Sequence, residues 1–180
     1  MHILPQSKAQ VQEELQLASA DLEQALAPLT DEQMTDLRDA AGWTIQDHLN
    51  HLAVWEESAA LVLERCPRAE RFAAMGVDFA TVENLSEDEE NALIRERTPS
   101  RTLAETRAAL RTAHEHLLSA LEPLSDADLE RSYSHYQSEV GTDSGRPIVA
   151  WIVGNSSEHY REHLPWIQAI ARPCLVFVQK

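Results

Sequence analysis

Four long stretches of this chain carry apolar residues at the spacing of an amphipathic helix. The stretches cover residues 6–27, 45–66, 102–122 and 147–172. A proline follows each of them, at Pro28, Pro67, Pro123 and Pro173. The chain contains only 5 glycines, while 43% of its residues are hydrophobic, which favours packed helices over a turn-rich β fold. We therefore predict an all-α four-helix bundle that forms a single domain over residues 1–180.

The connections between these stretches differ in length. About 35 residues separate the second stretch from the third, and their polar and apolar pattern predicts a long crossover with one or two short helices. A connection of this length can return along the bundle. The second and third helices can then be parallel, and the second and fourth antiparallel.

Two histidines, His159 and His163, stand four residues apart in the last stretch, on one face of the expected helix. That face is apolar at both ends and polar in the middle, and a face of this kind normally packs inward. Its members are Ile148, Ile152, Asn155, His159, His163, Trp166 and Ile170. Leaving a buried polar group unpaired costs about 1–3 kcal/mol, so both imidazoles need partners. A divalent metal ion is one such partner, and hydrogen bonds within the core are the alternative.

The second stretch adds His48 and His51 on one flank of its apolar face. Thr44 and Asp47 have the spacing of a capping box, which predicts that the helix starts at residue 45. On spacing alone, either histidine could serve as a ligand, fill the core or lie at the surface.

The expected topology places three histidines at one level. His51 is about 10 Å along its helix, and His163 is about 12 Å from the far end of the last helix. If these helices are antiparallel neighbours, His51 meets His159 and His163 near one end of the bundle. His114 and His116 lie off the centre of the third stretch's apolar face and are expected at the surface.

Charge and cysteine content exclude several classes of protein. The net charge is −15, and an acidic surface repels phosphate backbones, so we expect no nucleic-acid partner. No apolar run is long enough to span a membrane, and no signal-peptide pattern is visible, so the expected location is cytoplasmic. Cys66 and Cys174 are too few for a disulfide framework.

Two motifs resemble those of a known family. Residues 43–52 (WTIQDHLNHL), with Trp55 and Glu56, resemble the second-helix signature of the DinB-like four-helix bundles. Residues 155–163 (NSSEHYREH), with Ile167, look like the last-helix signature of their ClbS/DfsB branch. Residues 105–129 are similar to that branch's third helix and the turn after it.

This resemblance implies a bundle in up-down-down-up order that is often a homodimer. In metal-binding relatives, one histidine of the second helix and a His-x-x-x-His pair of the last helix hold a divalent ion. The matching positions here are His51, His159 and His163, whereas His48 matches no ligand position. The ion could be nickel, zinc, iron or manganese, since sites made of imidazoles accept all of these.

The resemblance suggests a metal-dependent enzyme for detoxification or small-molecule modification. The ion would activate water or a low-molecular-weight thiol, in a reaction of the hydrolase or thiol S-transferase type. No catalytic side chain is assigned, but Asn155, one turn before His159, is a candidate for a contact with a ligand residue or the substrate.

Two alternatives stay open at this point. A metal-free ClbS-like resistance protein would bind or hydrolyse an electrophilic small molecule in a pocket walled by Trp43, Trp55, Trp151 and Trp166. A structural bundle without chemistry is the other. We also predict that the apolar tail at residues 174–178 packs on the bundle or on a partner chain.

Overall fold

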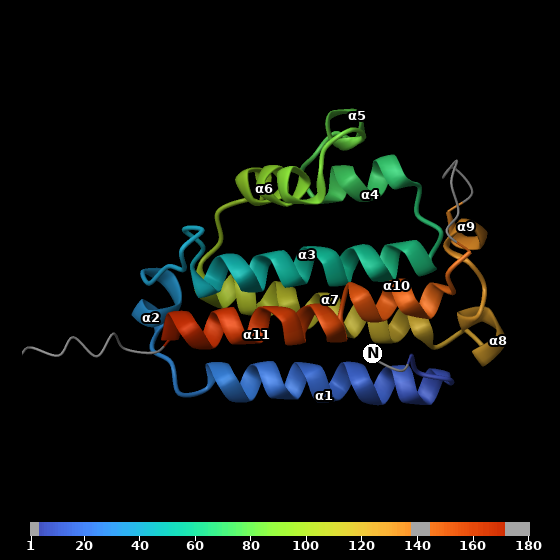
Figure 1. Ribbon diagram of the computed structural model, residues 1–180, viewed down its shortest axis with the longest axis horizontal. Helices are drawn as coiled ribbons and strands as arrows, with labels where there is room; N and C mark the ends of the chain where they lie inside the picture. The colour runs from blue at the N-terminus through green and yellow to red at the C-terminus, as the bar shows by residue number, and fades with distance from the viewer. Residues whose placement is uncertain (1–3, 138–144, 172–180) are drawn as a thin grey trace, which may run out of the picture.

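The computed structural model describes residues 4–137 and 145–171, and within this part of the chain all regular elements are helices (Figure 1). The predicted all-α class is confirmed. The long helices are α1 (Lys8–Leu26), α3 (Ile45–Leu63), α7 (Leu103–Leu121) and α11 (Ser157–Ala171), with α10 (Ile148–Gly154) directly before α11. The shorter helices are α2 (Asp31–Thr35), α4 (Arg68–Ala74), α5 (Phe79–Val82), α6 (Glu87–Arg97), α8 (Asp126–Leu129) and α9 (Tyr133–Tyr136). The apolar tail at residues 174–178 lies outside the described residues.

The long helices lie side by side, and α3 and α7 run in the direction opposite to α1 and the α10–α11 pair (Figure 1). Because α3 and α11 are antiparallel, an early residue of α3 and late residues of α11 reach the same end of the molecule. Buried apolar residues from these helices form two clusters, one around Leu15, Leu117 and Ile152 and one around Leu22, Leu49 and Ile167. No described helix is long and apolar enough to cross a lipid bilayer.

Local side-chain chemistry explains where the helices begin. The Ser7 side chain accepts a hydrogen bond from the Gln10 amide and caps α1. The predicted capping box of α3 is confirmed, because Thr44 and Asp47 each accept from the other's backbone N–H.

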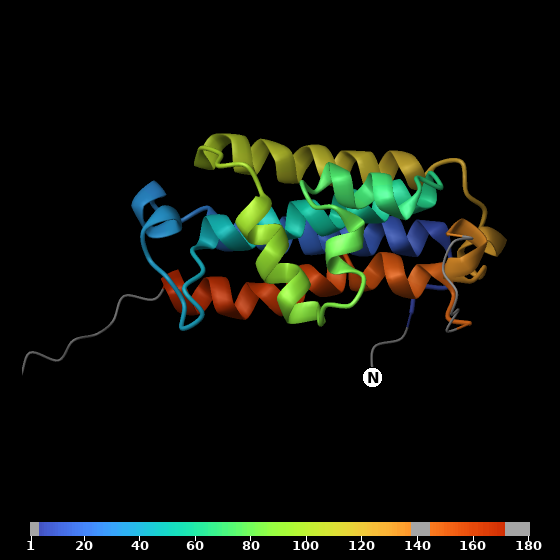
Figure 2. The same ribbon diagram turned by 90° about the horizontal axis from the view of Figure 1, so that it is seen from above.

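The crossover between α3 and α7 contains three helices, α4, α5 and α6, where the sequence predicted one or two. They lie on the outer face of α3 (Figure 1). Viewed from above, α6 runs obliquely across α3 (Figure 2). The two ends of α6 therefore lie over opposite flanks of α3.

The predicted continuous last helix is wrong, because the chain breaks between α10 and α11. Asn155 has φ −98° and ψ 8°, outside the helical region, and its side-chain amide donates to the Trp151 carbonyl at 2.8 Å. The Ser156 hydroxyl donates to the Ile152 carbonyl at 2.6 Å. Side chains that bond to nearby carbonyls in this way compete with the helical ladder.

The break changes which face of α11 is buried. Tyr160 and Ile167 lie at the centre of its packed face, and both are almost fully buried. Trp166, which the continuous stripe placed inside, is half exposed. The histidines of α11 therefore lie toward an edge of the packed face, where a pocket opens.

Candidate metal centre

Three imidazoles converge, one from α3 and two from the first half of α11. Nε2 of His51 lies 3.1 Å from Nε2 of His159. The ring of His51 stacks on that of His163, with centroids 4.9 Å apart and planes inclined by 25°. One ring nitrogen from each of the three residues falls within 4.8 Å of the others.

The three imidazoles are neutral at physiological pH. Burial lowers the pKa of His51 to about 3, that of His159 to about 4 and that of His163 to about 2. A positive charge on one imidazole would repel a positive charge on the next. This repulsion between neighbouring histidines lowers the pKa of His51 and of His163 further. Neutral imidazole carries one lone pair, so the cluster gathers three nitrogen donors at one point.

These three ring nitrogens are better arranged to bind a divalent cation than to form hydrogen bonds with one another. Nitrogens bound to zinc at 2.0–2.1 Å in a tetrahedral site lie about 3.4 Å apart, close to the His51–His159 separation. A buried imidazole ligand normally has a hydrogen-bond partner at its other nitrogen. Nδ1 of His159 departs from this pattern, because it is buried without a partner among the described residues.

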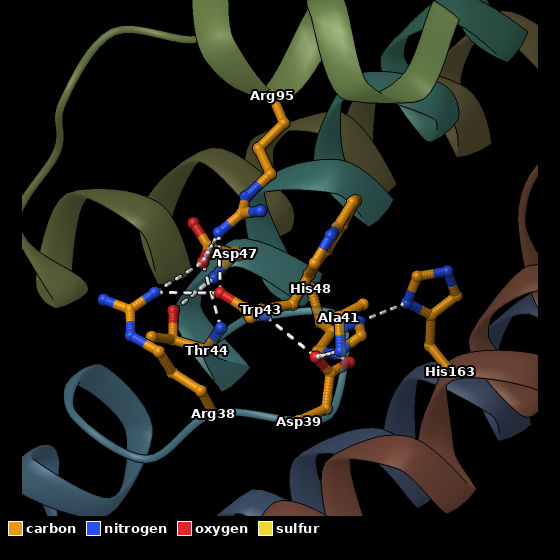
Figure 3. Close-up of polar contacts among 10 residues, drawn as sticks. Arg38, Asp39, Ala41, Trp43, Thr44, Asp47, His48, Arg95 and His163 are labelled. Carbon is orange, nitrogen blue, oxygen red and sulfur yellow. Dashed lines mark hydrogen bonds and ion pairs between the residues drawn. The ribbon is translucent and has the colours of Figure 1, made fainter. Parts of the chain in front are cut away.

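The fourth histidine, His48, lies behind the other three. Its Nδ1 forms a hydrogen bond of 2.9 Å with Nδ1 of His163, and its Nε2 lies 3.3 Å from Oδ2 of Asp39 (Figure 3). The other oxygen of Asp39 accepts from the backbone N–H groups of Ala41 and Trp43, each at 2.9 Å. Burial lowers the pKa of His48 despite the opposing effect of the Asp39 carboxylate. The loop before α3 thus positions Asp39, Asp39 holds His48, and His48 contacts His163.

A pocket of about 620 Å³ opens beside the four histidines. Its walls include the indole rings of Trp43, which lies 5.3 Å from the His51 ring, and Trp166, which lies 4.9 Å from the His163 ring. The first residues of α6, Glu87 and Asp88, also line it. We call this space the histidine pocket; it is lined by Asp39, Ala40, Ala41, Trp43, His48, His51, Glu87, Asp88, Asn91, Ala92, His159, Glu162, His163 and Trp166.

Other residues named from the sequence lie elsewhere. Asn155 is absent from the lining of the histidine pocket, and its amide bonds to Trp151, as described above. Among the predicted tryptophan walls, Trp55 donates to Asn91 at 3.1 Å, and the Trp151 ring packs against Tyr133 with the two planes tilted by 53°. Only the other two tryptophans, Trp43 and Trp166, line this pocket.

A second buried polar group was missed by the sequence analysis. Glu56 of α3 is fully buried and accepts hydrogen bonds from the Tyr160 hydroxyl and, at 2.9 Å, from Nδ1 of His114. Burial, followed by the nearby Glu56, raises the pKa of Tyr160 well above its ordinary value, so its hydroxyl keeps its proton. We call these residues the Glu56 cluster. The expectation that His114 lies at the surface is wrong, because its side chain is only 15% exposed.

His116 lies outside both buried groups, and its side chain is 28% exposed. It bridges two carboxylates, Glu57 of α3 at 3.0 Å and Glu64, directly after α3, at 3.1 Å. These carboxylates raise its pKa, although partial burial acts in the opposite direction.

An all-helical fold with three histidines from two antiparallel helices defines a class of candidate metalloproteins. The sequence model of the DinB superfamily matches residues 14–163, and the chain belongs to this superfamily. A crystal structure of an uncharacterised protein from Escherichia coli UTI89 is similar in fold, with a TM-score of 0.64 and 18% identity. The match covers 93% of this chain and 94% of that one. No curated protein matches the chain.

Proposed function

We propose that the protein is a metal-dependent enzyme that binds a divalent ion through His51, His159 and His163. The observation that carries this proposal is the convergence of three neutral ring nitrogens within 4.8 Å beside an open pocket. When bound, the ion would lower the pKa of a water molecule or a low-molecular-weight thiol and so supply a nucleophile at neutral pH. The reaction would be of the hydrolase or thiol S-transferase type, for detoxification or small-molecule modification.

The surrounding residues have separate roles in this proposal. His48 and Asp39 hold the His163 ring in orientation, as residues behind a metal ligand commonly do. Trp43 and Trp166 provide flat apolar walls against which a small molecule can pack and exclude water. Glu87, Asp88 and Glu162 line the same pocket and give it a negative field that concentrates cations near the ligands.

The finer architecture is also a proposal. We infer that α1, α3, α7 and the α10–α11 pair form the up-down-down-up four-helix bundle of the superfamily as a single DinB-like domain. The directions of these helices support this inference. Assignment to the ClbS/DfsB branch, a cytoplasmic location, a homodimer, a thiol co-substrate, a role for Asn155 and the absence of a nucleic-acid partner stay predictions.

Metal analysis is the direct test. Protein purified without a histidine tag or added metal should contain close to one equivalent of nickel, zinc, iron or manganese. After treatment with a chelator, one of these ions should rebind with 1:1 stoichiometry and raise the melting temperature, because a ligand that binds only the folded state stabilises it. If none of the four ions binds or changes the melting temperature, the metal-free resistance protein becomes the better reading.

A further inference from the structure

A second pocket, of about 380 Å³, lies on the other flank of α3. We call it the basic pocket; it is lined by Thr35, Arg38, Thr44, Gln46, Asp47, Asn50, His51, Ile94, Arg95, Thr98, Pro99, Ser100 and Arg101. Three of its residues are arginines, and only Asp47 is acidic. In a chain with 15 basic and 30 acidic residues, this local excess of positive charge runs against the average.

The sequence of α6 explains why two pockets of opposite charge lie so close together. Acidic residues fill its first turn, and Arg95 and Arg97 lie in its last turn, in accordance with the helix dipole. In the ribbon, α6 crosses α3 obliquely (Figure 2). Glu87 and Asp88 at its start line the histidine pocket, and Arg95 near its end lines the basic pocket.

The three guanidinium groups retain most of their donors. Arg95 uses Nη2 for the Gly42 carbonyl and for Asp47, both at 2.9 Å. Arg38 uses Nη1 for the Gly42 carbonyl at 2.9 Å, and Arg101 uses Nη1 for the Asn50 amide oxygen at 3.3 Å. A guanidinium has five N–H donors, so several per arginine have no protein acceptor among the described residues.

The charge balance in this pocket is positive. Asp47 lies 2.9 Å from Arg95 and 3.9 Å from Arg38, and one carboxylate offsets one of the three positive charges. The N-terminus of α3, a helix of 19 residues, adds the positive end of its dipole at the same place. A planar anion with two oxygens matches the forked donors of arginine.

We propose that the basic pocket binds a small anion, through a carboxylate or phosphate group, directly beside the histidine pocket. His51 lines both pockets. Arg95 lies over the Trp43 ring at 5.0 Å, and that ring lies 5.3 Å from His51. The anion is therefore held beside the triad, since His51 belongs to the triad and lines the basic pocket. The overall charge of −15 disfavours a polyanion such as nucleic acid and favours a small anion.

The test uses full-length protein treated with a chelator, so that its outcome is independent of metal binding. Isothermal titration with inorganic phosphate and, separately, with succinate at constant ionic strength should show saturable 1:1 binding of at least one of them. Binding of phosphate alone assigns the phosphate class, and binding of succinate alone assigns the carboxylate class. If neither binds saturably, the proposal is overturned.

Matched arginine variants locate the site. Arg101→Gln and Arg38→Gln should each weaken binding about tenfold or more, since each removes a charge-assisted donor. Arg38 is 55% exposed, so its substitution is tolerated by the fold even if that of Arg101 is not. Arg95 is left intact because it supports the loop at Gly42 and the start of α3.

Two controls keep this proposal distinct from the metal proposal. Arg107→Gln removes a partly exposed arginine that pairs with Glu23 outside the pocket, and it should leave anion affinity unchanged. His163→Ala should lose metal binding and keep anion binding. Equal losses in Arg101→Gln, Arg38→Gln and Arg107→Gln would show a general charge effect and would overturn the assignment to this pocket.

Discussion

The four histidines beside the pocket (His48, His51, His159 and His163), here called the histidine cluster, and the Glu56 cluster are two buried polar groups. Both involve residues of α3 and α11, yet their chemistry differs. In the Glu56 cluster, a carboxylate that only accepts meets a tyrosine hydroxyl and an imidazole N–H that donate. In the histidine cluster, imidazole meets imidazole. Nε2 of His51 lies 3.1 Å from Nε2 of His159, and Nδ1 of His48 lies 2.9 Å from Nδ1 of His163. Nδ1 of His159 has no partner among the described residues. The first group is complete within the protein, whereas in the second we propose that a cation binds the converging ring nitrogens.

This contrast separates a structural role from a ligand role for buried polar residues. A complementary set of donors and acceptors stabilises the fold and specifies which helix faces meet. A set of like donors is costly to the apo fold, and its cost is recovered on ligand binding. Substitutions in the two clusters should therefore change different measured quantities.

The largest effect is expected at the triad. His51→Ala, His159→Ala and His163→Ala should each abolish stoichiometric metal binding, a loss of more than 100-fold, because two imidazoles leave the site open to water. Isothermal titration with the ion found in the purified protein is the measurement. His116→Ala is the matched control, since His116 contacts only exposed carboxylates, and it should bind metal like the wild type. Equal affinity in all four variants would place the site elsewhere.

In the Glu56 cluster, the expected effect is on stability. Glu56→Ala leaves the Tyr160 hydroxyl and the His114 N–H buried without an acceptor and creates a cavity, which should cost about 3 kcal/mol of unfolding free energy. Urea unfolding of the metal-free protein measures this loss. Glu56→Gln, which keeps an acceptor oxygen, should lose less. If Glu56→Ala is as stable as the wild type but loses metal, the division between the two clusters is wrong.

His48 should show an intermediate effect on metal binding. Since His48 orients His163 without belonging to the converging triad, His48→Ala should retain 1:1 stoichiometry and lose about 10- to 100-fold in affinity. The resemblance gave His48 no ligand position, and its contact with His163 now gives it a positioning role in this proposal. Asp39→Asn should produce a smaller loss in the same titration. Complete loss of stoichiometric binding in His48→Ala would make it a ligand instead.

The last expected effect concerns pH. The folded pKa values of the triad, about 2 to 4, lie below the unfolded value of about 6.5, so the unfolded chain binds more protons between these limits. Stability of the metal-free protein should therefore fall as pH falls from about 6.5 toward 4, by up to about 1.4 kcal/mol per pH unit for each histidine. His163→Leu should reduce this slope by about one histidine's share in urea unfolding at pH 6.5, 5.5 and 4.5. An unchanged slope would mean that His163 is already charged when folded.

Much of this arrangement could be predicted because it depends on local rules. Helix stripes, prolines and the Thr44–Asp47 box fix the helices within a few residues, and the spacing of His159 and His163 fixes their common face. The meeting with His51 followed from an assumed topology and agrees with the observed cluster.

The missed features depend on tertiary contacts. Asp39 reaches His48 only because the loop before α3 folds back on the helix. The spacing of apolar residues along the sequence does not predict the conformation of a loop. The break at Asn155 results from competing side-chain hydrogen bonds. Glu56 did leave a signal, since it stands four residues after Leu52 and three before Ala59, on the apolar stripe of α3. A charged residue in such a stripe predicts a buried partner.

The two tryptophans of the histidine pocket give the protein an optical reporter. The Trp43 ring lies 5.2 Å from the His48 ring and 5.3 Å from the His51 ring, and Trp166 lies 4.9 Å from His163. An open-shell ion on the triad would quench the fluorescence of these indoles, whereas zinc, with its filled d shell, would leave their intensity nearly unchanged. Trp151, which packs on Tyr133, supplies emission from outside the pocket. Emission from the native, unlabelled chain would thus distinguish zinc from an open-shell ion at the triad.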